Sequence, residues 1–97
     1  MKNILFLFLT PMLLQVNAQK HSLEKVWETD SVIAVPESVL PVKNILYVSL
    51  IDGGGWDADG KGGVAKLGPD GKILDATWIT GLNAPKGLGI AGNRLYV

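Results

Sequence analysis

Residues 35–48 read VPESVLPVKNILYV, and residues 84–97 read APKGLGIAGNRLYV. The second stretch repeats the first after 49 positions without a gap, and Pro, Asn, Leu, Tyr and Val recur in register. A self-similar period of about 40–50 residues, built from short strands and glycine-rich turns, is typical of β-propeller blades. The repeat therefore predicts an all-β fold in which each unit of 49 residues is one blade.

Four strands are predicted within the first unit, at residues 37–42, 44–51, 63–67 and 72–79. Residues 45–50 carry apolar side chains on both faces, as a strand between two packed layers does. The sequence Gly68-Pro69-Asp70-Gly71 has Pro second and Gly fourth, which fits a type I turn and predicts a hairpin. In the second copy, residues 91–93 predict another hairpin turn.

This pattern predicts how the chain is divided. Residues 19–34 are expected to form an N-terminal segment, residues 35–83 the first blade, and residues 84–97 the start of a second blade. Because the second copy reaches Val97 in the middle of a strand, the expectation is a propeller fragment of about one and a half four-stranded blades.

A further strand is expected at residues 23–29. Trp27-Glu28-Thr29 precedes Pro36 much as Trp78-Ile79-Thr80 precedes Pro85, with a two-residue difference in length. The segment would then be the outer strand that closes the ring, with the remaining blades missing from this chain. An independent edge strand or a plain linker is the alternative.

Residues 1–18 have the features of a secretory signal peptide. Lys2 gives a basic start, residues 4–14 are almost wholly apolar, and Val16-Asn17-Ala18 fits a cleavage site. Cleavage is expected between Ala18 and Gln19, which predicts export to the periplasm or the cell exterior. Since a bilayer core of about 30 Å requires roughly 20 apolar residues, no stable membrane span is expected.

Charge and composition exclude several classes of protein. Lys and Arg number nine, as do Asp and Glu, so the chain lacks the basic excess of a nucleic-acid-binding protein. The absence of cysteine excludes disulfides and thiolate chemistry. His21, the single histidine, follows the expected cleavage site, and no Ser-His-Asp set can be assembled around it.

Residues 52–63 form a loop rich in Gly and Asp. Its stretch from Gly55 to Lys61 matches G-x-x-x-x-G-K, but a strand follows instead of a helix, so nucleotide binding is not expected. Asp57-Ala58-Asp59 begins like a calcium loop, yet Gly68 stands where the bidentate Glu belongs.

Two hypotheses stay open for this loop. Its carboxylates, from Asp52, Asp57 and Asp59, are candidates for a looser cation site together with loop carbonyls, and the alternative is a solvated loop. Trp56, an aromatic residue in polar surroundings, is a candidate ligand contact.

The repeated motifs resemble the regucalcin/gluconolactonase superfamily and are similar to NHL-type repeats. The resemblance rests on Pro-Glu-Ser-Val at 36–39, Asn-Ala-Pro-Lys-Gly-Leu-Gly-Ile at 83–90 and the two Leu-Tyr-Val triplets, and it covers most of residues 24–97. It implies a six-bladed propeller. In the lactonase members, a Glu just before the inner strand of the first blade binds a divalent metal on the central axis. Glu37 matches that position, so the resemblance implies a calcium, zinc or manganese site.

Lys86 departs from this pattern, because the lactonases have an Asn ligand at the equivalent place in the next blade. An ammonium group has no lone pair to offer and repels a cation. Glu37 and Lys86 are therefore predicted to form an ion pair at the mouth of the channel, with metal ligation by Glu37 as the alternative.

Two functions follow from these alternatives. The first is a binding propeller that recognises a small polar ligand or a protein partner through its axial face. The second is a metal-dependent lactonase or related hydrolase, in which a metal held by Glu37 polarises a carbonyl. The sequence leaves open whether the protein is an enzyme.

Overall fold

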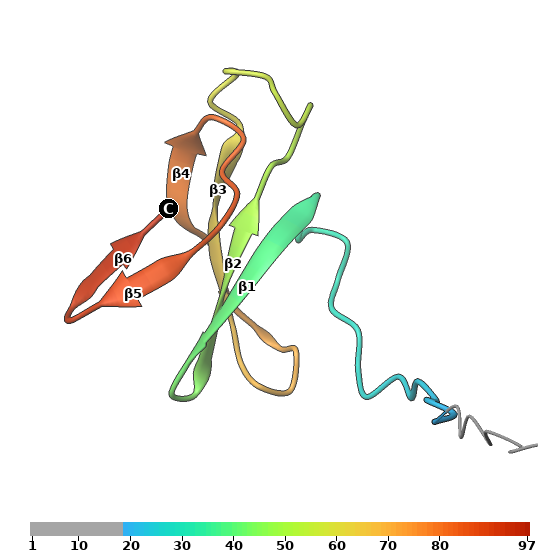
Figure 1. Cartoon of the computed structure of the whole chain (residues 1–97). Coiled ribbons are helices and arrows are strands. Elements are labelled where there is room, and N and C mark those ends of the chain that lie inside the picture. Colours follow the sequence, from blue (N-terminus) through green and yellow to red (C-terminus); the bar gives the residue numbers. More distant parts are fainter. Residues whose placement is uncertain (1–18) are drawn as a thin grey trace, which may run out of the picture.

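The computed structural model describes residues 19–97, and all the regular structure in that range is β (Figure 1). One antiparallel sheet has the strand order β1-β2-β3-β4, and β5 pairs with β6 in a separate hairpin. The strands are β1 (Pro36–Val42), β2 (Ile45–Leu50), β3 (Gly62–Leu67), β4 (Ile73–Leu82), β5 (Gly89–Ala91) and β6 (Arg94–Tyr96). The predicted all-β class and the four-stranded sheet are confirmed. The predicted signal peptide lies outside the described residues, and within residues 19–97 no helix could cross a membrane.

The sequence repeat is also a repeat of backbone structure. In the β5–β6 hairpin Ala91 lies opposite Arg94, as Val42 lies opposite Ile45 in the β1–β2 hairpin 49 positions earlier. Both turns begin with a residue in the left-handed region, with φ of 54° at position 43 and 59° at position 92. The short β5–β6 hairpin therefore reproduces the tip of the longer one.

The chain also enters the two copies in the same way. Val35 and Ala84, each directly before a proline, have φ of 49° and 41°. A β-branched residue rarely adopts this conformation, which costs on the order of 1–3 kcal/mol. The Val35 carbonyl accepts a hydrogen bond of 3.0 Å from the Ile51 amide, which holds the strained residue at the end of β2. An unfavourable backbone angle is thus kept at both equivalent positions.

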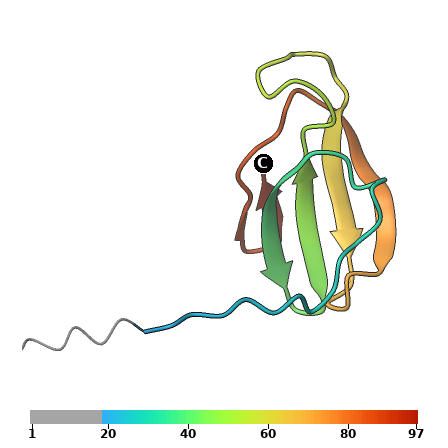
Figure 2. The ribbon, with the colours of Figure 1, turned by 90° about the vertical axis from the view of Figure 1, so that its right-hand side faces the viewer.

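The hydrophobic core covers one face of the sheet. Ile33, from the N-terminal segment, packs there against Val48, Leu50, Ala65 and Leu67. Figure 2 shows residues 20–35 crossing this face, while the β5–β6 hairpin lies on the opposite side of the sheet. Because β2 and β3 lie between these two coverings, they are the most buried strands. The apolar pattern of residues 45–50 predicted this position.

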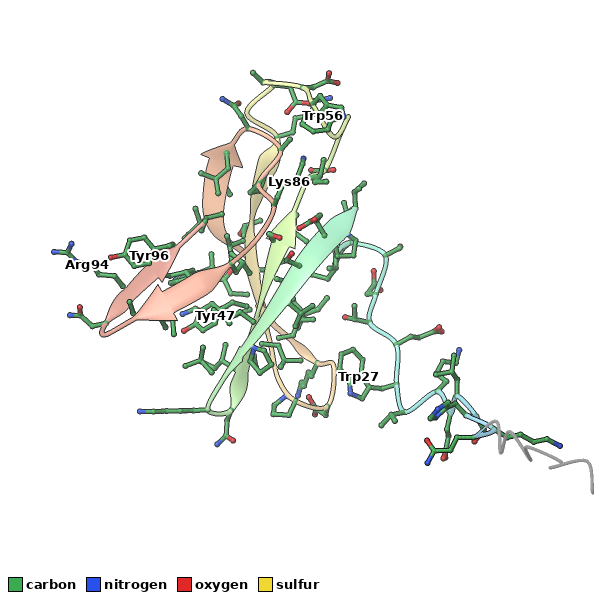
Figure 3. All side chains as sticks on the ribbon, in the orientation of Figure 1. Trp27, Tyr47, Trp56, Lys86, Arg94 and Tyr96 are labelled. Atoms are coloured by element: carbon green, nitrogen blue, oxygen red, sulfur yellow. The ribbon has the colours of Figure 1, made fainter. Side chains whose placement is uncertain are left out.

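The opposite face carries a cluster of three side chains, one from each of three adjacent strands. The ring centroids of Tyr47 and Trp78 lie 5.1 Å apart. The Lys66 ammonium lies 4.0 Å from the Trp78 ring and 5.8 Å from the Tyr47 ring. Tyr47 points to the side of the sheet on which the hairpin lies (Figure 3).

Residues 19–35 contain no strand. The strand expected at residues 23–29 would pair with strands outside this chain, so it stays a prediction. A strand is stabilised by a hydrogen-bonded neighbour, and this segment pairs with neither edge of the sheet. It also buries little apolar surface, since Leu23 and Val26 are 103% and 85% exposed.

Trp27 instead lies against the turn between β3 and β4. In that turn the Gly71 amide donates a hydrogen bond of 3.0 Å to the Gly68 carbonyl, as the Gly-Pro-Asp-Gly sequence predicted. Gly71 has φ of 81°, and a Cβ at this position would overlap the Trp27 ring. Glycine is therefore required here both by the backbone angle and by the indole.

Candidate functional site

Two connections meet at one end of the sheet. The β2–β3 loop (residues 51–61) and the β4–β5 segment (residues 83–88) lie together at the top of Figure 1, at the end where β1 begins. Close packing fixes the second connection, because the buried Pro85 ring contacts Gly62 at the start of β3. A Cβ on Gly62 would also lie 2.8 Å from the Leu50 carbonyl oxygen, so glycine is what allows this approach. The residue after Pro85 is Lys86, which this contact places beside the β2–β3 loop.

Hydrogen bonds join the two connections. The Gly60 amide donates to the Asn83 side-chain oxygen at 2.9 Å. The Lys86 ammonium donates a hydrogen bond of 2.5 Å to the Gly55 carbonyl and a longer one of 3.4 Å to the Ala84 carbonyl. A glycine-rich loop loses much conformational entropy when it becomes ordered. These hydrogen bonds offset part of that cost.

Within the loop, the Asp57 amide donates to the Gly54 carbonyl at 3.1 Å and closes a turn. Asp59 accepts a hydrogen bond of 3.0 Å from the Lys61 amide. The loop around Trp56 is thus held both by local bonds and by the β4–β5 segment.

A shallow pocket of about 220 Å³ lies between the two connections. Its walls are residues 55–58 of the loop and Asn83, Ala84 and Lys86 of the β4–β5 segment. The Trp56 indole is 93% exposed, and the Lys86 ammonium lies 5.0 Å from its ring centroid (Figure 3). A cation at this distance from an aromatic ring is attracted to its π-electrons. We call this group of residues the Trp56 pocket.

The three carboxylates of the loop are not brought together. Among residues 19–97, no group of three or more His, Asp or Glu side chains could hold a metal ion. The Asp57 side chain lies beside the backbone of Gly54, and that of Asp59 lies beside Gly53. A looser cation site that also uses loop carbonyls, as the sequence suggested for Asp52, Asp57 and Asp59, stays a prediction.

Glu37 lies at a β-bulge near the start of β1, where the register moves from Pro36 opposite Leu50 to Ser38 opposite Ser49. Its exposed carboxylate accepts a hydrogen bond of 2.5 Å from the Ser38 hydroxyl. The buried Ser49 hydroxyl in turn accepts from the Ser38 amide at 3.1 Å, which stabilises the bulge.

The predicted ion pair between Glu37 and Lys86 is not formed. Lys25 and Glu28, 2.9 Å apart, make the one ion pair within residues 19–97. The reason lies in the repeat, which places Lys86 against the loop of the preceding unit and not against its own counterpart Glu37. One carboxylate oxygen of Glu37 accepts the Ser38 hydroxyl and the other has no partner within residues 19–97. Metal ligation by Glu37, which would need ligands from other blades, stays a prediction.

Asn83 belongs to the pocket and was missed by the sequence analysis. Its side chain receives the Gly60 amide, while the equivalent position in the first copy is Ala34. A polar residue in place of an apolar one, two residues before a repeated proline, was the available signal.

Comparison of the chain with protein-family models, with curated proteins and with solved structures gave no match.

Proposed function

We propose that residues 35–83 form one blade of a β-propeller of the gluconolactonase or NHL-like type. The loop end of this blade binds a small polar ligand or a partner, and the protein acts outside the cytoplasm. The observation that carries the proposal is that the Trp56 pocket is built from two successive repeat units, with Lys86 of the second holding the loop of the first. Ligand pockets occur preferentially where separate structural units meet.

The repeated tyrosines support the blade. Tyr47 is partly covered by Lys66 of β3 and Trp78 of β4, whereas its counterpart Tyr96 in the β5–β6 hairpin is 56% exposed. In the first copy, side chains of β3 and β4 cover this tyrosine. In the second copy, the equivalent surface around Tyr96 is open. Units that bury their faces against neighbouring units are what a propeller requires.

Binding at the loop end can be tested by NMR on the full-length protein. Amide shifts would be followed while sugar acids, lactones, amino acids and nucleotides are added in turn. We expect the shift changes to cluster at residues 55–60 and 83–87 and to spare the β3–β4 turn at the other end of the sheet. Shift changes confined to the β3–β4 turn, or none with any of these compounds or with a neutral oligosaccharide, would contradict the proposal.

A further inference from the structure

We propose that the Trp56 pocket binds a neutral carbohydrate, with one sugar ring stacked on the Trp56 indole. This inference rests on the proposed binding function of the same pocket and specifies the class of its ligand.

The exposure of Trp56 sets it apart from the other two tryptophans. Trp27 and Trp78 are 40% and 37% exposed and contact Gly71 and Tyr47, whereas Trp56 is 93% exposed. A single exposed aromatic residue on an unstructured loop would need no explanation. Here the loop is held in place on both sides of the indole, through Gly55 and Gly60. A rigidly presented aromatic surface next to a pocket favours binding, because little side-chain freedom is lost when a ligand covers it.

The polar groups around the indole can both donate and accept hydrogen bonds. The Lys86 ammonium has three hydrogens and contacts two carbonyls, which leaves one hydrogen to donate. Asn83 uses its oxygen for the Gly60 amide, and its NH₂ group has no hydrogen-bond partner within residues 19–97. Asp57 also lines the pocket, and a carboxylate is a hydrogen-bond acceptor. A pyranose ring matches this set, since its C–H face is apolar and its hydroxyls donate and accept.

The charges favour a neutral ligand. Among the residues that line the pocket, Asp57 and Lys86 carry one charge of each sign, so the site has no net charge to attract an anion or a cation. A cationic ligand would compete with Lys86, whose ammonium already lies over the indole at 5.0 Å. The pocket volume of about 220 Å³ is below the roughly 300–1,000 Å³ of sites for drug-sized ligands. It therefore suits a single sugar unit, free or within an oligosaccharide that continues into solvent.

The test is a titration of the full-length protein with neutral oligosaccharides, namely cellohexaose, xylohexaose, maltohexaose, mannohexaose and N-acetylchitohexaose. Oligogalacturonate serves as the anionic comparison. The indole N–H resonances of the three tryptophans report separately on Trp56, Trp27 and Trp78. We expect at least one neutral oligosaccharide, and not oligogalacturonate, to shift the Trp56 indole together with the amides of residues 55–58 and 83–86.

Substitutions then separate stacking from indirect effects. Trp56→Ala should weaken that binding by about tenfold or more, and Trp56→Tyr should retain most of it. Trp27→Ala is the matched control, because Trp27 lies against the β3–β4 turn at the other end of the sheet, and it should leave affinity within about twofold of wild type. Unchanged amide spectra outside the loop would show that Trp56→Ala is folded.

Two results would overturn the inference: the absence of a Trp56 shift with every neutral oligosaccharide, or equal affinity in wild type and Trp56→Ala. If charged metabolites shifted residues 55–60 and 83–87 while no oligosaccharide bound, the ligand class would be wrong and the proposed function would stand. If no compound of either set affected this end of the sheet, both would fail.

Discussion

The ammonium group of Lys86 lies 2.5 Å from the carbonyl oxygen of Gly55, so the second repeat unit holds the loop of the first. The same group lies over the Trp56 ring, and the contact of Pro85 with Gly62 delivers it there. One half-buried cation therefore fixes both the backbone and the aromatic side chain of the Trp56 pocket. Its counterpart Glu37 has no such role in this structure.

The first prediction concerns this contact. Lys86→Met should keep most of the apolar stem while removing the hydrogen bond to Gly55 and the cation over Trp56. We expect faster amide hydrogen exchange in residues 55–61 and a loss of about 1.5–3 kcal/mol of stability, the range for a hydrogen bond that involves a charged group. Lys72→Met is the control, because the exposed Lys72 side chain makes no hydrogen bond in residues 19–97. Equal exchange rates in the two variants would contradict the role given to Lys86.

The second prediction concerns Glu37. Because its carboxylate is exposed and bonded to the neighbouring Ser38 hydroxyl, Glu37→Gln should change stability by no more than about 0.5 kcal/mol. Calorimetric titrations of calcium, zinc and manganese into wild type and variant should give the same result for each ion. Tight binding in wild type that disappears in Glu37→Gln would restore the metal-dependent lactonase hypothesis.

The sequence predicted the sheet better than the site. Strand limits followed from alternation and turn chemistry, which are local, so β1 to β4 appear within a few residues of their predicted positions. The predicted ion pair between Glu37 and Lys86 does not form. A repeat in the sequence shows which residues are equivalent, but it does not show which residues are in contact. Lys86 contacts Gly55, 31 residues earlier, through a backbone carbonyl that has no sequence signature. Residues 23–29 form no strand here. The strand expected there stays a prediction, because its partner strands would lie outside this chain.

The third prediction concerns the strained approach to β1. Val35 has φ of 49°, so Val35→Gly should remove a backbone strain on the order of 1–3 kcal/mol. The more flexible unfolded chain of the glycine variant offsets about 0.5–1 kcal/mol of that gain. We expect denaturant unfolding to show unchanged or slightly greater stability. Val39→Gly is the control at an exposed position within β1, where glycine should destabilise by about 1 kcal/mol. Equal losses in both variants would mean that the angle at Val35 is not strained in solution.

The fourth prediction follows from the exposed apolar surface of the proposed blade. Residues 19–97 produced alone leave Leu74, Ile90 and Tyr96 open to water, together with the edges of the four-stranded sheet. We expect broad thermal unfolding or concentration-dependent association, since such edges and patches favour self-association. Calorimetry and analytical ultracentrifugation would measure both. A sharp cooperative transition in a strict monomer would show that these residues form a complete domain and would contradict the blade proposal.

The fifth prediction compares two glycines to separate the steric clash of an added Cβ from the energetic cost of a positive φ angle. Gly71 and Gly81 have nearly the same φ, 81° and 78°, so alanine meets a similar backbone penalty at both positions. At Gly81 no atom lies within 4 Å of the added Cβ, whereas at Gly71 the Cβ would overlap the Trp27 ring. Gly81→Ala should therefore cost about 1 kcal/mol, and Gly71→Ala should cost about 1–2 kcal/mol more while displacing the indole.

Trp27 itself provides the decisive comparison for that prediction. In a Trp27→Ala background the indole is gone, so the two alanine substitutions should destabilise the protein equally in urea unfolding. Tryptophan fluorescence in the Gly71→Ala single variant should also move to longer wavelength as Trp27 enters water. A difference between the two glycine positions that persisted without Trp27 would mean that the N-terminal segment does not pack on the β3–β4 turn. The covering of one sheet face by residues 19–35 would then have to be abandoned, and with it the burial of Ile33 in the core.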